Sequence, residues 1–286
     1  MQRTAIIGLG AIGFGMATQL LKAGFPLAVY NRTAERAIPL RASGAEIAST
    51  PKEAAADADV VISIVADDVA SRQVWLSADG ILGALKPGAI AIECSTLSVA
   101  WVRELAAKVT GSGCEFLDAP VTGSKTHAAA GELQFLVGGD AATVERARPV
   151  LKAMSRNIVH MGAAGCGAMI KLVNNYLCGV QAASLAEAVS LIERSGLDRE
   201  RSLEILNNGA PGSPLIKTLS ARMTSRNYDV NFLLRLMKKD LEYAGREAEA
   251  HDLHFKMGTA AASIFEQAQR QGWGEKDFSA VVETSR

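Results

Sequence analysis

The sequence predicts an α/β protein with two domains. We expect an N-terminal doubly wound sheet of the Rossmann type over residues 1–163 and an all-α C-terminal domain over residues 164–286, joined by a long helix. Three observations predict this fold. Up to about residue 160, short apolar runs alternate with helical stretches, which is typical of a doubly wound sheet. A glycine-rich loop directly follows the first apolar run, and strand signals vanish after Gly165.

The N-terminal part contains apolar runs that we interpret as strands. They are rich in Val, Ile and Leu, as expected for parallel strands covered on both faces. Their ranges are 4–8, 27–31, 60–65, 89–94, 115–119, 133–138 and 157–161. The stretches between them favour helices. One runs from Thr50 to Ala58, where Thr50 is a suitable N-cap, Pro51 the first helical residue and Glu53 the third.

The C-terminal part is expected to be helical throughout. A long apolar helix runs from about Gly165 to about Glu193 and breaks at Ser195-Gly196. Further helices follow, interrupted at 209–214 and 270–277. A long apolar helix needs partners to cover it, so we expect a homodimer or homotetramer.

The bulk properties exclude several classes of function. The chain has 286 residues, with 30 Lys and Arg against 30 Asp and Glu, and such a balance argues against a nucleic-acid-binding surface. No apolar run is long enough to span a bilayer, and the N-terminus has no signal-peptide layout, so we predict a cytoplasmic protein without membrane association. The four cysteines fit no zinc spacing, and only His251 and His254 lie close together, so we expect no metal site.

The glycine loop after the first strand has the spacing of a dinucleotide-binding motif. It reads Gly8-Leu9-Gly10-Ala11-Ile12-Gly13. Gly8 permits the tight turn, Gly10 lets the backbone approach a pyrophosphate, and Gly13 allows the helix to pack against the strand. The diphosphate would lie at the helix N-terminus, where free N–H groups favour an anion. Because the loop follows a strand and opens a helix, the context fits the motif.

The end of the second predicted strand favours NADP(H) over NAD. An NAD site usually places a carboxylate there for the ribose 2′-hydroxyl, but the sequence continues as Asn31-Arg32-Thr33. Arg32 can pair with a phosphate, and Thr33 adds a hydroxyl. The alternative is that Arg32 is only a solvated surface residue.

A second glycine-bearing segment, residues 118–133, follows the strand at 115–119. Thr122, Gly123 and Ser124 can offer two hydroxyls and backbone N–H groups to a substrate carboxylate. Ligands of doubly wound folds bind at this edge of the sheet. The alternative is an ordinary loop between a strand and a helix, which can look the same.

Lys171 is the cation near the start of the long apolar helix. Asn174 and Asn175 follow it at i+3 and i+4, on the same face. Proximity to the helix N-terminus and apolar neighbours both lower the pKa expected for the amine, which suits a general acid or base. The alternative is a lysine that extends into water.

These motifs together resemble the β-hydroxyacid dehydrogenase family, and the resemblance spans essentially the whole chain. It is carried by GLGAIG at 8–13, DAPVTGS at 118–124, GCGAMIKLVNN at 165–175 and KKDL at 238–241. Many members have Ser-Gly-Gly at the position of Thr122-Gly123-Ser124. The Gly-Ser form followed by Lys125, together with the NRT at 31–33, looks more like the glyoxylate/succinic semialdehyde reductase branch.

The resemblance implies a role for each matching residue. Lys171 would protonate the substrate carbonyl oxygen, and Asn175 would hold the substrate. Residues that the resemblance places near substrate or cofactor are Val65, Thr96, Thr122, Gly123, Ser124, Asn174, Phe232, Lys239 and Asp240, with Val65, Thr96 and Lys239 on the cofactor side.

The leading hypothesis is an oxidoreductase that transfers hydride from NADPH to a small carboxylated aldehyde, such as glyoxylate or succinic semialdehyde. A first alternative is a 3-hydroxyisobutyrate-type or 2-hydroxymethyl acid dehydrogenase that uses NAD(P)+. A second is a non-catalytic dinucleotide-binding scaffold. Imine reductases share the architecture but usually lack the lysine, so Lys171 argues against that activity.

Overall fold

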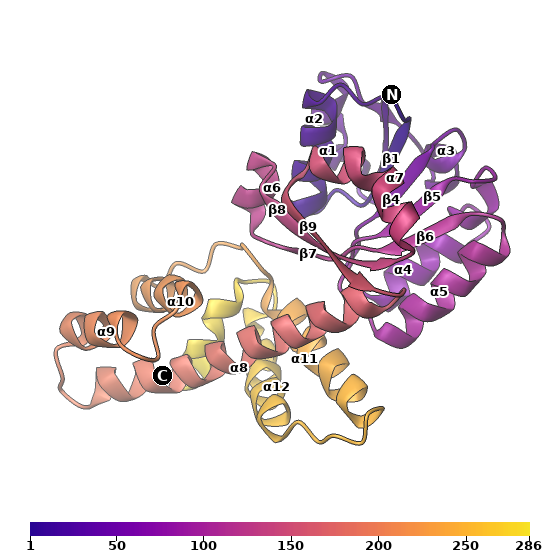
Figure 1. The fold of residues 1–286 in the computed structure, drawn as a ribbon. Coiled ribbons are helices and arrows are strands. Elements are labelled where there is room, and N and C mark those ends of the chain that lie inside the picture. The colour runs from indigo at the N-terminus through magenta and orange to yellow at the C-terminus, as the bar shows by residue number, and fades with distance from the viewer. The chain divides into compact units, whose positions relative to one another are not determined.

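The computed structural model describes all residues, 1–286, and the chain forms two compact units, Met1–Lys171 and Leu172–Arg286 (Figure 1). The boundary lies inside helix α8 (Cys166–Arg194), so one continuous helix belongs to both units. The long helix expected from about Gly165 to about Glu193 is therefore confirmed.

The first unit is an α/β structure. Its strands are β1 (Thr4–Ile7), β2 (Leu27–Tyr30), β3 (Glu46–Ile47), β4 (Val60–Ser63), β5 (Ile90–Glu93), β6 (Glu115–Asp118), β7 (Val121–Thr122), β8 (Leu133–Gly139) and β9 (Ser155–Gly162). Its helices are α1 (Ala11–Lys22), α2 (Ile38–Arg41), α3 (Pro51–Ala55), α4 (Asp68–Leu76), α5 (Val99–Gly111), α6 (Lys125–Ala130) and α7 (Ala141–Lys152), with short 3₁₀ turns η1 (Ala34–Arg36) and η2 (Leu82–Ala84).

The strands form one sheet in the order β3-β2-β1-β4-β5-β6-β8-β7, with β9 paired to β8. The strands β3 to β6 along this path are parallel, in the order that a Rossmann sheet has. The predicted doubly wound sheet is therefore confirmed. Strand β8 differs from the expectation, because it runs antiparallel to β6. An apolar run looks the same in either direction, since its partner strand decides the orientation.

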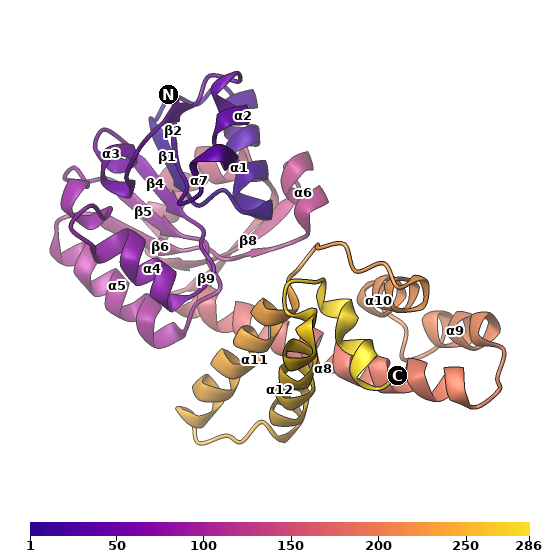
Figure 2. The same cartoon turned by 180° about the vertical axis from the view of Figure 1, so that it is seen from behind.

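Helices cover both faces of the sheet. Helices α1 and α7 lie on one face, and α4 and α5 on the other (Figures 1 and 2). Residues of α1 and α7, such as Met16, Leu20 and Val144, pack into one apolar cluster with the strands. Strands β1, β4 and β5 are buried at every position, which explains their continuous apolar sequences. The carboxyl ends of the parallel strands consequently meet at one edge.

The second unit is helical, as predicted. Beyond α8 it comprises α9 (Arg199–Asn208), α10 (Pro214–Ser225), α11 (Leu234–Glu249), α12 (Lys256–Ala268), a π-helical turn η3 (Gln269–Trp273) and a 3₁₀ segment η4 (Phe278–Thr284). Its apolar cluster joins the middle of α8 to α11, α12 and η4, with Ala186, Phe265 and Val281 fully buried. One side of α8 stays open, because Leu177 and Leu191 are 51% and 70% exposed.

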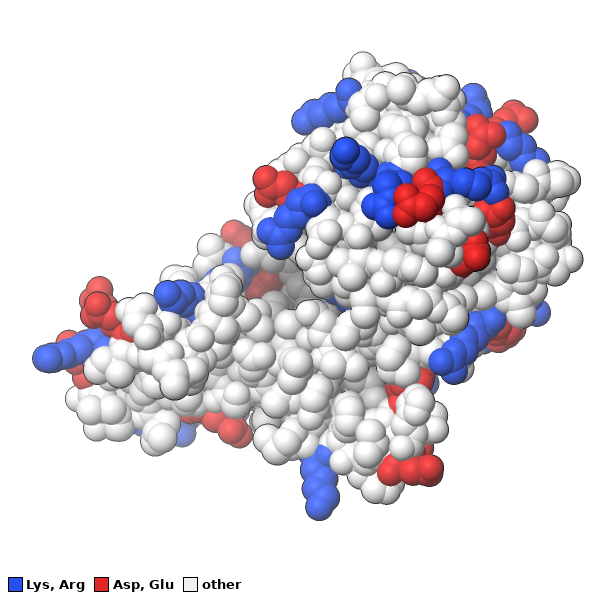
Figure 3. Space-filling view, in the orientation of Figure 1, with Lys and Arg blue, Asp and Glu red and all other residues white.

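The surface carries charges of both signs. On the face drawn in Figure 3, Lys and Arg are interspersed with Asp and Glu rather than separated by sign. None of the helices combines the length and apolar character needed to cross a membrane.

Candidate functional site

The glycine loop between β1 and α1 is shaped by steric contacts that differ from one glycine to the next. Gly8 has φ +104°, and a Cβ there would lie 2.1 Å from the carbonyl oxygen of Ile64. A Cβ on Gly13 would lie 2.1 Å from the carbonyl oxygen of Gly8. A Cβ on Gly10 would meet nothing within 4 Å. The fold therefore requires Gly8 and Gly13, whereas Gly10 leaves open space at the start of α1, as the approach of a pyrophosphate requires.

Asn31 links the glycine loop to the end of β2. Its Oδ1 accepts a hydrogen bond from the Leu9 N–H at 2.8 Å, and its Nδ2 donates to the Thr33 carbonyl at 2.8 Å. Arg32 and Thr33 are exposed beside it. This strand end thus presents a guanidinium and a hydroxyl. The hydrogen bonds of Asn31 hold the glycine loop against it.

The loops that follow β4 and β5 are joined by a buried polar network. The Val65 N–H donates to Ser95 Oγ at 2.7 Å, and the Ser95 N–H donates to Glu93 Oε1 at 2.9 Å. Glu93 is 1% exposed, and its Oε2 also accepts from Ser71 Oγ and Trp75 Nε1, both at 2.8 Å. Burial raises the pKa of Glu93. The network holds Val65 close to the strand that leads into Thr96.

Replacing Glu93 with glutamine is expected to destabilise the first unit. The Ser95 N–H faces one carboxylate oxygen and the Trp75 indole N–H faces the other. Neither group can accept a hydrogen bond, so an amide NH₂ would face a second donor in either orientation. An unsatisfied buried donor costs about 1–3 kcal/mol, and we expect a loss of that size in the free energy of unfolding. Urea denaturation followed by circular dichroism would measure it.

The matched control for Glu93→Gln is Glu104→Gln, which removes an exposed carboxylate paired with Arg72. Exposed ion pairs contribute little to stability, so this variant should unfold almost as the wild type does. Equal losses in the two variants would contradict the role assigned to the buried network.

The segment after β6 turns back through β7 and begins α6. Gly123 has φ +129°, in the left-handed region that favours glycine. The Ser124 N–H donates to His127 Nδ1 at 3.1 Å, and Ser124 Oγ lies 2.8 Å from the same nitrogen. His127 therefore engages one of the backbone N–H groups that the sequence offers for a carboxylate. Thr122 and Gly123 directly precede Ser124 in the chain.

Asp118, the last residue of β6, contacts the start of α8. Its side chain is fully buried. Oδ1 accepts from the Gly165 N–H at 2.7 Å, and Oδ2 accepts from the Ala168 N–H at 2.8 Å. Burial raises the pKa of Asp118 to about 6, although its hydrogen bonds oppose the shift. This carboxylate fixes the helix that carries Lys171 to the carboxyl edge of the sheet.

Along α8, Lys171 is partly exposed, and Asn175 lies one turn further on with 4% exposure. Within the second unit, Asn175 Nδ2 donates to Asp240 Oδ2 at 2.5 Å, and Asn174 Nδ2 donates to Asn175 Oδ1 at 2.9 Å. These two bonds fix the orientation of the Asn175 amide.

The remaining predicted residues of the second unit lie on and before α11. Lys239 Nζ is 3.0 Å from Asp240 Oδ1 and 4.8 Å from the centroid of the Tyr243 ring. Phe232 packs edge to face against Phe278, with ring centroids 5.9 Å apart. The structure thus brings Asn174, Asn175, Lys239 and Asp240 together, while Phe232 belongs to a neighbouring aromatic pair.

Several residues of these networks were not singled out from the sequence. Glu93 interrupts an apolar strand, and a charge inside such a run is a signal that could have drawn attention to it. Asp118 lies in the DAPVTGS motif at 118–124, but nothing in the motif itself indicates its contact with α8. His127 follows Ser124 by three residues, the spacing of a capping box, and this pattern could have been recognised.

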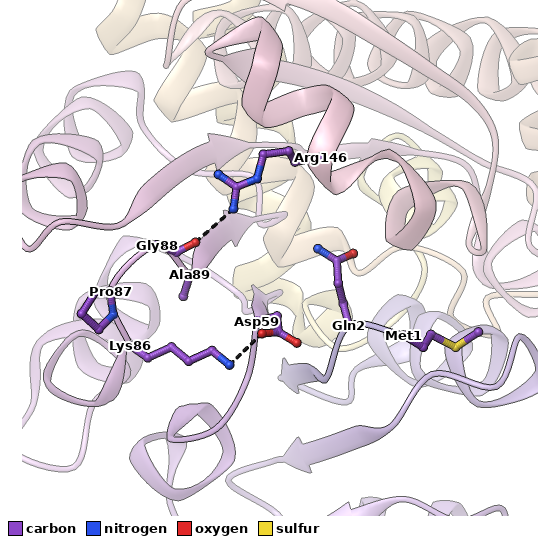
Figure 4. A pocket seen from close by; sticks show the side chains of 8 residues that line it. All are labelled: Met1, Gln2, Asp59, Lys86, Pro87, Gly88, Ala89 and Arg146. Carbon is purple, nitrogen blue, oxygen red and sulfur yellow. Dashed lines mark hydrogen bonds and ion pairs between the residues drawn. The ribbon is translucent and has the colours of Figure 1, made fainter.

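A hollow of about 500 Å³ lies at the opposite edge of the sheet, near the amino ends of β4 and β5 (Figure 4). Its lysine, Lys86, pairs with Asp59 at 2.7 Å, and Arg146 pairs with Glu115. Because carboxylates pair with both cations, and ligands of doubly wound folds bind at the other edge, the hollow is not the candidate site.

Comparison with known proteins identifies the family. Residues 3–162 match the NAD binding domain of 6-phosphogluconate dehydrogenase, and residues 165–285 match the NAD-binding domain of NADP-dependent 3-hydroxyisobutyrate dehydrogenase. An NAD-dependent L-serine dehydrogenase of Pseudomonas aeruginosa is 38% identical over 98% of this chain and 97% of its own. The chain belongs to the β-hydroxyacid dehydrogenase family.

Two further similar proteins agree with this assignment. The chloroplastic glyoxylate/succinic semialdehyde reductase 2 of Arabidopsis thaliana is 33% identical, over 97% of this chain and 77% of its own. The solved structure of Mycobacterium tuberculosis 3-hydroxyisobutyrate dehydrogenase with L-serine has a TM-score of 0.90 and 33% identity, and covers 100% of this chain and 99% of its own. The predicted family is confirmed. The general class of activity, an NAD(P)-dependent dehydrogenase of small hydroxy acids, is confirmed with it.

Proposed function

We propose that this β-hydroxyacid dehydrogenase reduces a small carboxylated aldehyde, such as glyoxylate or succinic semialdehyde, to the hydroxy acid with NADPH. The observation that carries the proposal is the placement of Lys171 and Asn175 one turn apart on α8, whose first turn Asp118 holds at the carboxyl edge of the sheet. Lys171 is the general acid in this proposal.

The residues at the sheet edge suit a nicotinamide dinucleotide. The space beside Gly10 accommodates the pyrophosphate, and the free N–H groups of the first turn of α1 favour its charge. Val65 and Thr96, on the loops joined by the Glu93 network, would lie on the nicotinamide side, and Lys239 would add a cation. When bound, the reduced nicotinamide supplies the hydride, and the protein supplies orientation and a proton.

Arg32 is the group expected to select NADP(H). Arg32→Ser should raise the KM for NADPH about 10–100-fold and leave the KM for NADH nearly unchanged, because a hydrogen bond to a charged group contributes about 1.5–3 kcal/mol. Steady-state kinetics with both cofactors would measure this. Arg36→Ser, which removes an exposed arginine on η1, is the matched control and should change neither constant. An unchanged NADPH preference in Arg32→Ser would remove the basis for NADP selectivity.

The substrate carboxylate is assigned to the segment Thr122, Gly123 and Ser124. Its hydroxyls and the positive φ of Gly123 suit an anion without a net charge, and His127 fixes the Ser124 hydroxyl. Asn175, oriented by Asp240, would hold the substrate, with Asn174 and Phe232 beside it. Fixing the carbonyl in this way can lower the barrier by up to roughly 7–11 kcal/mol.

Lys171 carries the proton in this scheme. As negative charge develops on the carbonyl oxygen, the ammonium stabilises it and then donates its proton to give the hydroxyl group. Turnover of glyoxylate and succinic semialdehyde, assayed by consumption of NADPH, tests the proposal directly.

A second candidate is the oxidation of a 3-hydroxy acid, of the 3-hydroxyisobutyrate or 2-hydroxymethyl acid type, with NAD(P)+. The 38% identity to an NAD-dependent L-serine dehydrogenase favours it. One panel separates the two candidates: both aldehydes with NADPH and NADH, and L-serine and 3-hydroxyisobutyrate with NADP+ and NAD+.

A cytoplasmic location and a homodimer or homotetramer complete the proposal. The exposed Leu177 and Leu191 of α8 support association.

A further inference from the structure

We propose that Asp118 is a positioning residue for Lys171, and that it sets the depth and rotation at which α8 begins. The inference rests on the proposed function, in which Lys171 donates the proton. It concerns a residue that contacts neither substrate nor cofactor in the scheme above and that acts through the backbone of α8.

The two hydrogen bonds of Asp118 determine the position of the first turn of α8. Each carboxylate oxygen accepts from a different backbone N–H, Gly165 at 2.7 Å and Ala168 at 2.8 Å. Two contacts on one turn fix both the height of the helix above β6 and its rotation about its own axis. Lys171 follows Ala168 by three residues, less than one turn, so a rotation of this turn displaces the lysine with it.

Two glycines, Gly138 and Gly167, allow close packing around the Asp118 carboxylate and the first turn of α8. A Cβ on Gly138 of β8 would lie 2.5 Å from Asp118 Oδ1. A Cβ on Gly167 would lie 2.2 Å from the Leu136 carbonyl oxygen and 2.9 Å from Asp118 Oδ2. The start of α8 therefore packs directly against the backbone of the sheet. This close contact leaves little room for the first turn to move along or around its axis.

The ionised form of Asp118 is the form that performs this role. Protonation would turn one oxygen into a donor, and that oxygen would no longer accept its N–H bond. Glu93 is the strand partner of Asp118 on β5, Cys94 follows it, and Arg103 of α5 lies beside Gly165. The other elements packed against this corner carry His160 on β9 and, on α8, Cys166 and Lys171. At neutral pH the carboxylate is ionised, since its pKa is about 6.

The principal test is Asp118→Asn, which keeps the shape of the side chain but leaves only one acceptor oxygen. We expect kcat per nucleotide-binding site to fall about 10–100-fold, with the dissociation constant for NADPH changed less than about twofold. We also expect the wild-type kcat to fall below about pH 6 and this dependence to be absent from the variant. A purely structural role would lower the melting temperature and the fraction of active sites but would not change kcat per site or the pH profile.

Asp140→Asn is the matched control. Asp140 caps α7 in the same unit, where its side chain accepts from the Thr143 N–H at 3.0 Å. The same chemical change at this second helix should lower stability and leave kcat per site unchanged. If Asp118→Asn does not fold, Gly167→Ala is measured instead, because it displaces the same turn while Asp118 stays intact, and it should also lower kcat per site.

Wild-type kcat and a wild-type pH profile in Asp118→Asn, or wild-type kcat in Gly167→Ala, would overturn the inference. Failure of the proposed function is a different result, in which Lys171→Met retains turnover. An inactive Lys171→Met together with a fully active Asp118→Asn would reject the positioning role alone.

Discussion

Lys171→Met is expected to lower kcat about 10²–10⁴-fold, the usual contribution of a general acid. Methionine has a similar length and helix propensity, so α8 should persist, but it has no proton to donate and no charge for the developing alkoxide. Binding of NADPH, measured by isothermal titration calorimetry, should stay within about twofold of the wild-type value, because Lys171 is assigned to the substrate carbonyl and not to the cofactor. Far-ultraviolet circular dichroism would confirm the fold.

Lys152→Met provides the control for the lysine substitution. Lys152 is exposed at the end of α7, and its loss should leave kcat unchanged. Turnover retained by Lys171→Met would show that another group donates the proton. A wild-type chain that binds NADPH and turns over no member of the substrate panel would favour the scaffold alternative.

Gly10→Ala is expected to lose affinity for NADPH, whereas Gly8→Ala is expected to lose folding stability. The added methyl at Gly10 meets no protein atom within 4 Å, so the variant should fold as the wild type does. It occupies the space assigned to the pyrophosphate, and we expect the affinity for NADPH to fall about 10–100-fold, since a forced steric contact costs about 1–3 kcal/mol. Calorimetric titration with NADPH measures this loss.

The methyl at Gly8 affects the protein itself. It would lie 2.1 Å from the Ile64 carbonyl, and φ +104° is strained for any residue with a Cβ. Steric overlap and backbone strain together are expected to cost about 2–6 kcal/mol of folding free energy, measured by urea denaturation. If Gly10→Ala loses stability and retains affinity, the space beside Gly10 is not the nucleotide site.

The sequence predicts the buried parallel strands and the long helix α8, because these elements have clear local patterns. Strands β1, β4 and β5 are short apolar runs covered on both faces, and α8 has the length and break that its sequence indicates. The two-residue strands β3 and β7 were not predicted, because two residues contain no periodicity. The direction of β8 depends on pairing with β6 across the chain, which no local pattern encodes.

In the candidate site, too, sequence patterns identify some residues, whereas other contacts form only when distant segments pack together. The glycine loop and the spacing of Lys171 and Asn175 are visible in the sequence, and the loop is sterically tight at Gly8 and Gly13 and open at Gly10. The partners of Glu93 are not visible, because Ser71 and Trp75 lie about twenty residues before it and reach it only after α4 packs on the sheet. The bond between Asp118 and Ala168 joins residues fifty positions apart.

The Glu93 network also provides an optical signal. Trp75 donates its indole N–H to Glu93, Trp101 donates to Ser71 in the same network, and the only other tryptophan, Trp273, belongs to the second unit. The tryptophan fluorescence of the first unit therefore comes entirely from two indoles beside the loops that follow β4 and β5. With tryptophan excited selectively over tyrosine, substituting Trp273 with phenylalanine would leave an emission spectrum that reports on this edge of the sheet alone, without a label.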